Sequence, residues 1–176
     1  MLINLVGGEA TGKSTLAQAL GQELDAHVVP ELLRDFVDTH KRVPRADEQH
    51  SVMEAQSESE RRALTQWNVV IGDPAPVMTA VYSQLYYDDD SLFALARIMG
   101  PPSDLVIWCG TDFTWQADGN QRDGPEFRDA ANTIIEIQVV PDLLVRGIDV
   151  LHVTGPQDKR LHAVLTHLRQ GVAPQT

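Results

Sequence analysis

Cysteine, long apolar runs and basic residues are all scarce in this chain of 176 residues. The single cysteine, Cys109, excludes a disulfide within the chain and a zinc site built from cysteines, and the apolar residues before it predict a buried strand. No apolar run approaches the ~20 residues that a membrane-spanning helix needs. The apolar run at the start, residues 1–6, lacks the basic region of a signal peptide. We therefore expect a cytoplasmic protein without a membrane partner.

The chain has 14 Lys and Arg against 25 Asp and Glu, which gives a net charge of −11. Such an acidic surface repels a phosphate backbone, so we expect no nucleic-acid partner. A small phosphorylated ligand is still compatible with it, because aimed backbone N–H groups and one lysine can hold a phosphate whatever the net charge. The length favours a single domain over residues 1–176, with a frayed tail at 170–176. Whether the chain forms a homo-oligomer stays open.

Residues 7–14, with the sequence GGEATGKS, match the P-loop pattern of Gly, four variable residues, Gly, Lys and a hydroxyl residue. The pattern requires a strand before it and a helix after it. Residues 1–6 are an apolar run suited to a buried parallel strand, and residues 14–24 place apolar side chains on one helical face. This context disfavours a glycine-rich turn that binds nothing. The predicted nucleotide-binding residues are Gly8, Glu9, Ala10, Thr11, Gly12, Lys13, Ser14 and Thr15.

Strand and helix signals alternate along the chain, which predicts a parallel α/β sheet with its ligand at the carboxyl edge. Strands are expected at 1–6, 26–30, 68–73, 104–109 and 149–153. Helices are expected at 14–24, 31–37, 46–66, 77–87, 91–99, 126–139 and 161–168, with Pro141 interrupting the sixth. The stretch 110–124 has no apolar periodicity, and long loops of this kind are usually functional.

Two carboxylates follow predicted strands at the edge where the P-loop lies. Asp73 ends the strand at 68–73, where it could hold hydrated Mg²⁺ together with the hydroxyl of Ser14; a turn or helix-cap role before Pro74 is the alternative. Glu31 follows the strand at 26–30 and shares a helical face with Arg34, for which a solvated ion pair is the alternative. Both acids are therefore candidates for the site.

Aromatic and polar residues elsewhere could complete a binding site. Tyr82 and Tyr86 share a face of the helix at 77–87, where a core position and a ring-stacking position are equally compatible with the spacing. Trp115 lies in the polar loop, which favours a binding role. Gln157 and Arg160 follow the last strand and could contact the adenine of a nucleotide; a simple helix N-terminus is the alternative.

Together the P-loop, the segment 29–35 (VPELLRD), Asp73 and the segment 115–122 (WQADGNQR) resemble the ribosylnicotinamide kinase domain of NadR-type proteins over about residues 1–170. The resemblance implies a three-layer P-loop kinase fold, a five-stranded parallel sheet in the order 2-3-1-4-5, and ATP and Mg²⁺ as cofactors. It also implies that Glu31, Arg34, Trp115 and Asp118 bind the substrate and that Arg122 belongs to a lid. The chain departs from the family pattern at Ala75, which replaces a second acid.

The predicted reaction is transfer of the γ-phosphoryl group of ATP to the 5′-hydroxyl of a nucleoside, with nicotinamide riboside as the acceptor that the resemblance implies. Lys13 would bridge the β- and γ-phosphates, and Glu31 or Asp73 would orient the hydroxyl. Arg122 would close over the transferred group, with Arg128 as a second candidate that could equally be a surface residue. Two other interpretations stay open: a kinase for another nucleoside, a nucleotide or a small alcohol, and a regulatory ATPase or nucleotide-sensing module.

Overall fold

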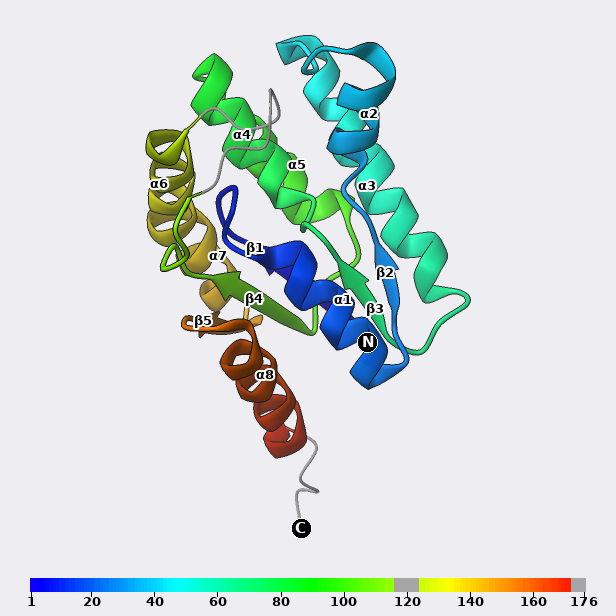
Figure 1. Cartoon of the computed structure of the whole chain (residues 1–176). Coiled ribbons are helices and arrows are strands. Elements are labelled where there is room, and N and C mark those ends of the chain that lie inside the picture. The colour runs from blue at the N-terminus through cyan, green and yellow to red at the C-terminus, as the bar shows by residue number, and fades with distance from the viewer. Residues whose placement is uncertain (116–123, 172–176) are drawn as a thin grey trace.

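The computed structural model describes residues 1–115 and 124–171. Five parallel strands form one sheet in the order β2-β3-β1-β4-β5. They are β1 (Leu2–Val6), β2 (His27–Val29), β3 (Val70–Gly72), β4 (Leu105–Cys109) and β5 (Asp149–Val153). The expected α/β class and strand order are therefore confirmed, and the P-loop follows the central strand (Figure 1).

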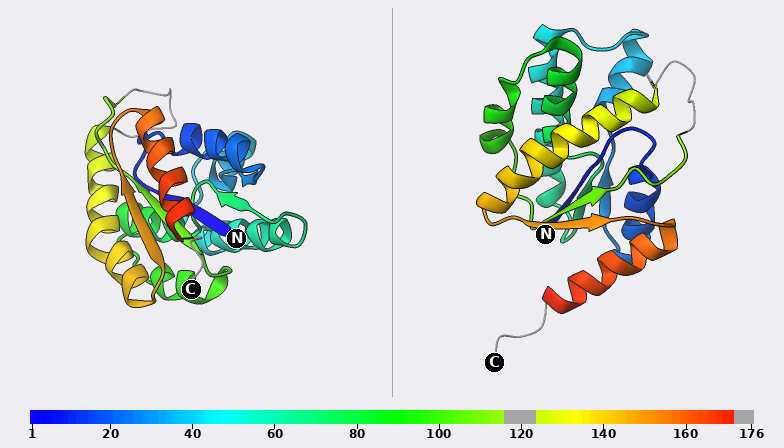
Figure 2. Two further views of the ribbon diagram at one scale, coloured as in Figure 1. Left: turned by 90° about the horizontal axis from the view of Figure 1, so that it is seen from below. Right: turned by 90° about the vertical axis from the view of Figure 1, so that its left-hand side faces the viewer.

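Helices cover both faces of the sheet, which gives three layers (Figures 1 and 2). One face carries α1 (Lys13–Leu24) and α8 (Gln157–Gly171). The other carries α3 (Gln49–Leu64), α4 (Val77–Tyr87), α5 (Leu92–Met99), α6 (Pro125–Ile134) and α7 (Val140–Val145). Helix α2 (Leu32–His40) and a 3₁₀ turn (Ala46–Glu48) lie beside α3, beyond the carboxyl end of β2.

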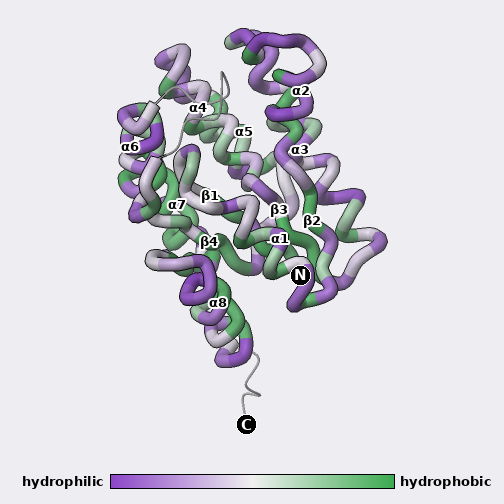
Figure 3. The backbone as a smooth tube through the Cα atoms, in the orientation of Figure 1, coloured by the Kyte–Doolittle hydropathy of each residue, from purple (hydrophilic) through white to green (hydrophobic). Residues whose placement is uncertain are grey.

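The core lies between the sheet and each helical layer because the strand side chains alternate between the two faces. On β1, Ile3 and Leu5 pack with α1 and α8, whereas Val6 packs with α4 and α6. Cys109 is completely buried, as expected, and burial raises the pKa of its thiol to about 11. Figure 3 shows hydrophobic residues along the strands, whereas α2 and the segment after it are largely hydrophilic. That polar region lies beside the carboxyl edge of the sheet.

The interruption expected at Pro141 does not occur. Helix α6 continues into a π-helical turn (Ile135–Val139) and then into α7, where Pro141 occupies one of the first two positions. A proline is tolerated there because its missing N–H would have no partner in the first turn of a helix. The wider π turn thus separates Pro141 from the preceding α-helical ladder, and the helical path reaches Val145.

The remaining elements differ from expectation mainly at their ends. The predicted helix at 46–66 begins with the 3₁₀ turn and ends at Leu64, and β3 is shorter than the predicted 68–73. The frayed tail was expected from residue 170, but Gln170 and Gly171 belong to α8, and the rest of that tail lies outside the described residues. Within residues 1–115 and 124–171, no helix is both long and apolar enough to span a membrane.

Candidate nucleotide-binding and acceptor site

The P-loop joins β1 to α1 with a backbone that needs glycine. Gly12 has a φ of +80°, and a Cβ at this position would lie 2.6 Å from Gln157 Nε2 and 2.8 Å from the ring of Phe113. Helix α1 begins at Lys13, directly after this turn, and its first turn contains no acidic residue. The positive end of the helix dipole and the free N–H groups of the first helical turn therefore lie directly at the loop. This is the arrangement that binds phosphate.

Lys13 lies folded over the loop. Its Nζ atom donates hydrogen bonds to the carbonyl oxygens of Gly7 and Gly8, both at 2.8 Å. Thr11 donates from its hydroxyl to the Gly8 carbonyl as well, at 2.7 Å. The ammonium group is thus held at the mouth of the loop, where a phosphate could exchange for these carbonyls.

A cavity of about 220 Å³ opens in front of the loop. Its donor side consists of the loop residues Glu9, Ala10, Thr11, Gly12, Lys13, Ser14 and Thr15, and its opposite side of Glu31, Leu33, Arg34, Val37, Val43, Pro44, Gln49, Tyr82, Tyr86 and Tyr87. Of the predicted nucleotide-binding residues, the stretch 9–15 therefore lines the cavity, whereas Gly8, Gln157 and Arg160 do not. Of the predicted substrate-binding residues, Glu31, Arg34 and Tyr82 line it.

Glu31 is the carboxylate that faces the P-loop across this cavity. Its side chain is 26% exposed, and its Oε2 atom lies 3.8 Å from Nε of Arg34. Burial raises the pKa of Glu31 above its usual value, the charges of Lys13 and Arg34 oppose that rise, and the charge of Asp73 adds to it. The four charged groups therefore form one electrostatic cluster at the carboxyl edge of the sheet.

Asp73 follows β3 and is 6% exposed. Its backbone N–H donates to the carbonyl oxygen of Val29 at 3.0 Å, which ties the ends of β2 and β3 together. Within the described part of the chain, its Oδ1 atom is buried and has no hydrogen-bond partner. A buried carboxylate oxygen without a donor is costly, so this atom is suited to a group that the chain itself does not supply.

Three tyrosines of α4 form the aromatic side of the cavity. The rings of Tyr82 and Tyr86 are 6.2 Å apart, and Tyr86 stacks on Phe127 of α6 at 5.7 Å. Burial raises the pKa of Tyr82 well above its usual value, and the charges of Glu31 and Glu9 add to that rise, so its hydroxyl stays protonated. Tyr87 also lines the cavity and was not among the predicted site residues.

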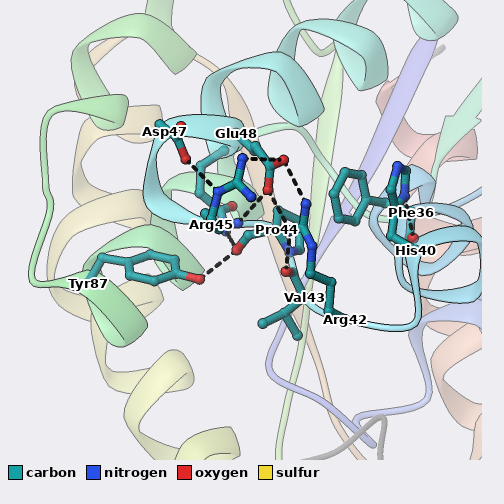
Figure 4. Close-up of polar contacts among 10 residues, drawn as sticks. Phe36, His40, Arg42, Val43, Pro44, Arg45, Asp47, Glu48 and Tyr87 are labelled. Atoms are coloured by element: carbon teal, nitrogen blue, oxygen red, sulfur yellow. Dashed lines mark hydrogen bonds and ion pairs between the residues drawn. The ribbon is translucent and has the colours of Figure 1, made fainter.

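Val43 and Pro44 bring the segment between α2 and α3, residues 42–48, to the edge of the cavity, and this rim was also missed. Figure 4 shows the polar contacts within it. Arg42 and Glu48 form a two-armed ion pair at 2.6 and 2.8 Å, and Glu48 also accepts from the backbone N–H of Arg45 at 2.8 Å. These contacts lower the pKa of Glu48 to about 2. The Tyr87 hydroxyl donates to the carbonyl of Pro44 at 2.5 Å, which fastens this rim to α4. No local sequence pattern indicates this pairing, because it depends on how the segment folds.

The other predicted residues that the structure describes do not line the cavity. Arg160 is completely buried and bonded to protein carbonyls, and Gln157 donates to Gly12. Arg128 donates from Nη1 to the carbonyl of Phe113 at 2.9 Å, and its side chain is 11% exposed. Trp115 is half-buried and does not line the cavity. Asp118 and Arg122 lie outside the described residues, so their predicted roles stay predictions.

Comparisons with known proteins show the same fold. The family model described as AAA domain matches residues 2–160, and a comparison with curated protein sequences found no match. NadR protein in complex with NAD and AMP-PNP superimposes with a TM-score of 0.77 at 19% identity, over 99% of this chain and 51% of that chain. Deoxyadenosine kinase from M. mycoides with bound dATP gives 0.68 at 14% identity over 96% and 99% of the two chains. Thymidylate kinase from Candida albicans gives 0.70 at 13% identity over 97% and 91%.

These structures share the fold, and the expected structural likeness to NadR-type proteins is confirmed at that level. The chain spans about half the length of the NadR structures, whereas it spans nearly all of the deoxyadenosine kinase. Because the AAA domain model covers all but the ends of the sequence, the chain belongs to the AAA domain family.

Proposed function

We propose that the protein is an ATP-dependent kinase that transfers the γ-phosphoryl group to the 5′-hydroxyl of a nucleoside, with nicotinamide riboside as the preferred acceptor. One observation carries this proposal: Lys13 of the P-loop and the carboxylate of Glu31 line the same cavity, whose remaining wall is largely apolar and aromatic. A loop that only holds a nucleotide needs no second wall of this kind. The cavity therefore combines a side suited to a phosphate donor with a side suited to a ring-bearing acceptor.

On the donor side, phosphoryl transfer requires positioning and neutralisation of charge. The N–H groups at the start of α1 would receive the β-phosphate, and Lys13 would leave the carbonyls of Gly7 and Gly8 to bridge the β- and γ-phosphates. Its two present acceptors are neutral, whereas a phosphate oxygen is charged, so the exchange is favourable. Lys13 is in this way kept close to the position where it would act.

Ser14 and Asp73 fit the ligand set of Mg²⁺. This ion prefers oxygen ligands, uses one or two carboxylates, and takes its other ligands from phosphates and water. The buried Oδ1 atom of Asp73 lacks a partner in the described part of the chain, and Ser14 lines the cavity beside Lys13. Bound Mg²⁺ would neutralise the charge of the transferring phosphates. No group of three or more His, Cys, Asp or Glu side chains in residues 1–115 and 124–171 forms a closed metal site.

On the acceptor side, Glu31 would accept a hydrogen bond from the nucleoside hydroxyl and orient its oxygen towards the γ-phosphate. General-base assistance of this kind typically contributes ~10²–10⁴-fold to the rate. The tyrosines of α4 would contact the ring, and a cationic pyridinium would gain cation–π attraction from them. The apolar side chains of Val37 and Val43 would exclude water from the same space.

Gln49 gives the acceptor side a polar feature. It lines the cavity, is 3% exposed and donates from Nε2 to the carbonyl of Pro44 at 3.3 Å. Its Oε1 atom has no partner among the residues that the structure describes. A buried acceptor atom without a partner, on a residue that lines the cavity, favours a ligand with an N–H donor, such as the carboxamide of nicotinamide.

Several comparisons support the proposal at the level of the fold. One solved structure of NadR is described as a complex with NR, another as a complex with NAD and AMP-PNP, and the deoxyadenosine kinase contains bound dATP. We extend the proposal to a small-molecule nucleoside substrate and a cytoplasmic location. Arg122 and Arg128 are proposed to approach the transferred phosphoryl group, and the contact between Gly8 of the P-loop and Arg128 at the start of α6 supports this role for Arg128.

The test is ADP release measured across a panel of nucleosides, nucleotides and small alcohols, with Lys13→Ala as the control. We expect turnover with nicotinamide riboside that Lys13→Ala abolishes. Turnover with another acceptor only would replace the proposed substrate, and ATP hydrolysis that no acceptor stimulates would identify a regulatory ATPase instead. Nicotinamide riboside phosphorylation that survives Lys13→Ala would contradict the role given to the P-loop.

A further inference from the structure

Arg160 of α8 joins three loops at the carboxyl edge of the sheet. It is completely buried, and Nη1 donates to the carbonyl oxygen of Thr11 in the P-loop at 2.7 Å. Nη2 donates to the carbonyl of Gly110 at 3.2 Å and to Oδ1 of Asp112 at 2.6 Å, both after β4. Nε donates to the carbonyl of Gly155, after β5, at 2.8 Å. Each of the three guanidinium nitrogens thus has an acceptor within the protein.

Gln157, one turn earlier on α8, holds the next carbonyl of the P-loop. Its Nε2 atom donates to the carbonyl oxygen of Gly12 at 2.7 Å. Asp112 completes the support, because its Oδ2 atom accepts from the backbone N–H of Gly155 at 2.6 Å. The ring of Phe113 lies 4.3 Å from the Arg160 guanidinium carbon and fills the space where Gly12 lacks a side chain. Asp112 and Phe113 therefore contact Arg160, while Arg160 and Gln157 hold the P-loop from the side away from the cavity.

The direction of these bonds determines where the N–H groups of the loop point. In a planar trans peptide the C=O and the N–H of the same unit point in opposite directions. Because Arg160 holds the Thr11 carbonyl at the back of the loop, the N–H of Gly12 is turned to the front. Because Gln157 holds the Gly12 carbonyl, together with the first helical bond from Leu16, the N–H of Lys13 is turned to the front as well.

We infer that Arg160 and Gln157 are positioning residues, which aim the phosphate-binding N–H groups of the P-loop from behind and do not read the adenine ring. This inference deepens the proposed function and rests on its use of a nucleotide donor. Donors fixed before the ligand arrives do not have to be ordered when it binds, which increases phosphate affinity. The buried guanidinium also places a positive group directly behind the loop, although Asp112 partly neutralises it.

The test compares Mg·ATP with inorganic tripolyphosphate, using calorimetric binding to the purified full chain. Tripolyphosphate carries the same phosphate chain without a base or sugar. In Gln157→Met we expect the Kd of both ligands to rise by the same factor, about three- to tenfold, because one net hydrogen bond that aligns the loop is lost. Gln170→Met on the exposed end of the same helix is the matched control and should leave both values unchanged.

Arg160→Lys provides the second variant, since Arg160→Met would remove the guanidinium donor from Oδ1 of Asp112 and from three carbonyls and could prevent folding. A lysine keeps the charge but cannot reach all four acceptors, so both Kd values should rise while thermal unfolding stays cooperative. A loss confined to ATP would overturn the inference in favour of adenine contact. No change for either ligand in Gln157→Met, or a wild-type chain that fails to bind tripolyphosphate, would overturn it too.

These measurements are independent of the acceptor. A chain that binds ATP and tripolyphosphate as described but phosphorylates no nucleoside would leave the positioning role intact and remove only the proposed acceptor. Conversely, normal kinase activity combined with an ATP-specific loss in Gln157→Met would remove the positioning role and leave the proposed function.

Discussion

The carbonyl oxygen of Arg128, in the first turn of α6, lies only 2.5 Å from the point where a Cβ on Gly8 would be placed. The Cα and Cγ atoms of Arg128 lie 3.1 and 3.0 Å from the same point. The second residue of the P-loop and the start of α6 are therefore in direct backbone contact. This contact fixes the distance between the P-loop and α6.

Gly8→Ala should consequently be far more harmful than an ordinary surface substitution. The added methyl group would contact a backbone carbonyl that cannot rotate away, so either the loop or α6 must shift. We expect a loss of about 1–3 kcal/mol in the free energy of unfolding and at least a tenfold rise in the Kd for Mg·ATP. Chemical denaturation and calorimetry measure the two quantities.

Gly100→Ala is the matched control. A Cβ there has its nearest neighbour, the hydroxyl of Ser57, at an ordinary 3.5 Å, and the backbone φ of −93° suits alanine. It should leave ATP binding unchanged and alter stability by less than about 0.5 kcal/mol. Equal effects of the two substitutions would contradict the importance of the contact between Gly8 and α6.

The charge of Arg34 is expected to set the acid limit of catalysis. As a general base, Glu31 must be ionised, so kcat/KM falls as the pH drops through its pKa, which burial raises above the usual value. Arg34 opposes that rise. Arg34→Met should therefore move the acid limb of the pH–rate profile to higher pH, whereas Glu31→Gln should remove the limb and lower kcat by ~10²–10⁴-fold.

The control for this experiment is Arg169→Met, which removes a positive charge from the exposed end of α8. Its profile should coincide with that of the wild type. An acid limb in Glu31→Gln with the wild-type midpoint would show that another group titrates, and Asp73 would then be the better candidate for the base.

Local sequence signals were sufficient to predict the fold and the residues on one side of the cavity. The P-loop pattern, the apolar runs and the proline and glycine boundaries depend on neighbours in sequence. They predicted all five strands, and the predicted loop residues 9–15 line the cavity. Glu31 could be placed because a residue after a parallel strand must lie at the carboxyl edge. That topology also brings Glu31 close enough to Lys13 for the lysine charge to oppose the rise that burial causes in the pKa of its carboxyl group.

The opposite wall of the cavity could not be predicted in this way. Gln49 and Tyr87 both line the cavity and both donate to the carbonyl of Pro44, which for Tyr87 is a contact between residues 43 apart in the sequence. The inward position of Arg160 likewise depends on carbonyls that lie about 50 and 149 residues away in the sequence. Hydrogen bonds from side chains to distant backbone groups produce no periodic pattern in the sequence. The sequence therefore suggested a ligand contact for Arg160, whereas its side chain contacts the P-loop.

Gln49 should discriminate between acceptors by the substituent of the ring. Nicotinamide riboside carries an amide N–H₂ that can donate to the unpartnered Oε1 atom, whereas nicotinic acid riboside carries a carboxylate that cannot. We expect Gln49→Leu to lower kcat/KM about tenfold for the amide and to leave or improve the value for the acid. Gln18→Leu on the exposed face of α1 controls for a glutamine lost elsewhere. A parallel loss with both substrates would exclude this role of Gln49.

Glu60 of α3 should make the stability of the protein depend on pH. Its side chain is completely buried, and within the described residues neither carboxyl oxygen has a hydrogen-bond partner. The Oε1 atom and Oδ1 of Asn4 both lie over Gly72, 2.4 and 1.9 Å from the position of a Cβ there. Burial raises the pKa of Glu60 to about 8, although the Asn4 side chain opposes this. At neutral pH the folded chain therefore holds a proton that the unfolded chain releases.

The sign of the effect follows from this difference in proton binding. Below pH 4.5, Glu60 is protonated in both states and adds no pH dependence to the stability. Between pH 4.5 and about 8 the unfolded state alone loses the proton, so the free energy of unfolding falls as the pH rises, by at most about 1.4 kcal/mol per pH unit. Glu60→Gln carries no titrating group and should lack this fall. Its stability relative to the wild type should therefore increase by a few kcal/mol between pH 5 and pH 8.

Denaturant unfolding of both chains at pH 5, 6, 7 and 8 measures that difference directly. Glu54→Gln, on the exposed side of the same helix, removes a carboxylate without removing the buried one and should follow the wild-type curve. Because other groups titrate in both chains, only the gap between wild type and Glu60→Gln reports on Glu60. A gap that stays constant across the four pH values would mean that Glu60 is ionised in the folded protein, and that Asn4 and Gly72 leave room for a donor to its carboxylate.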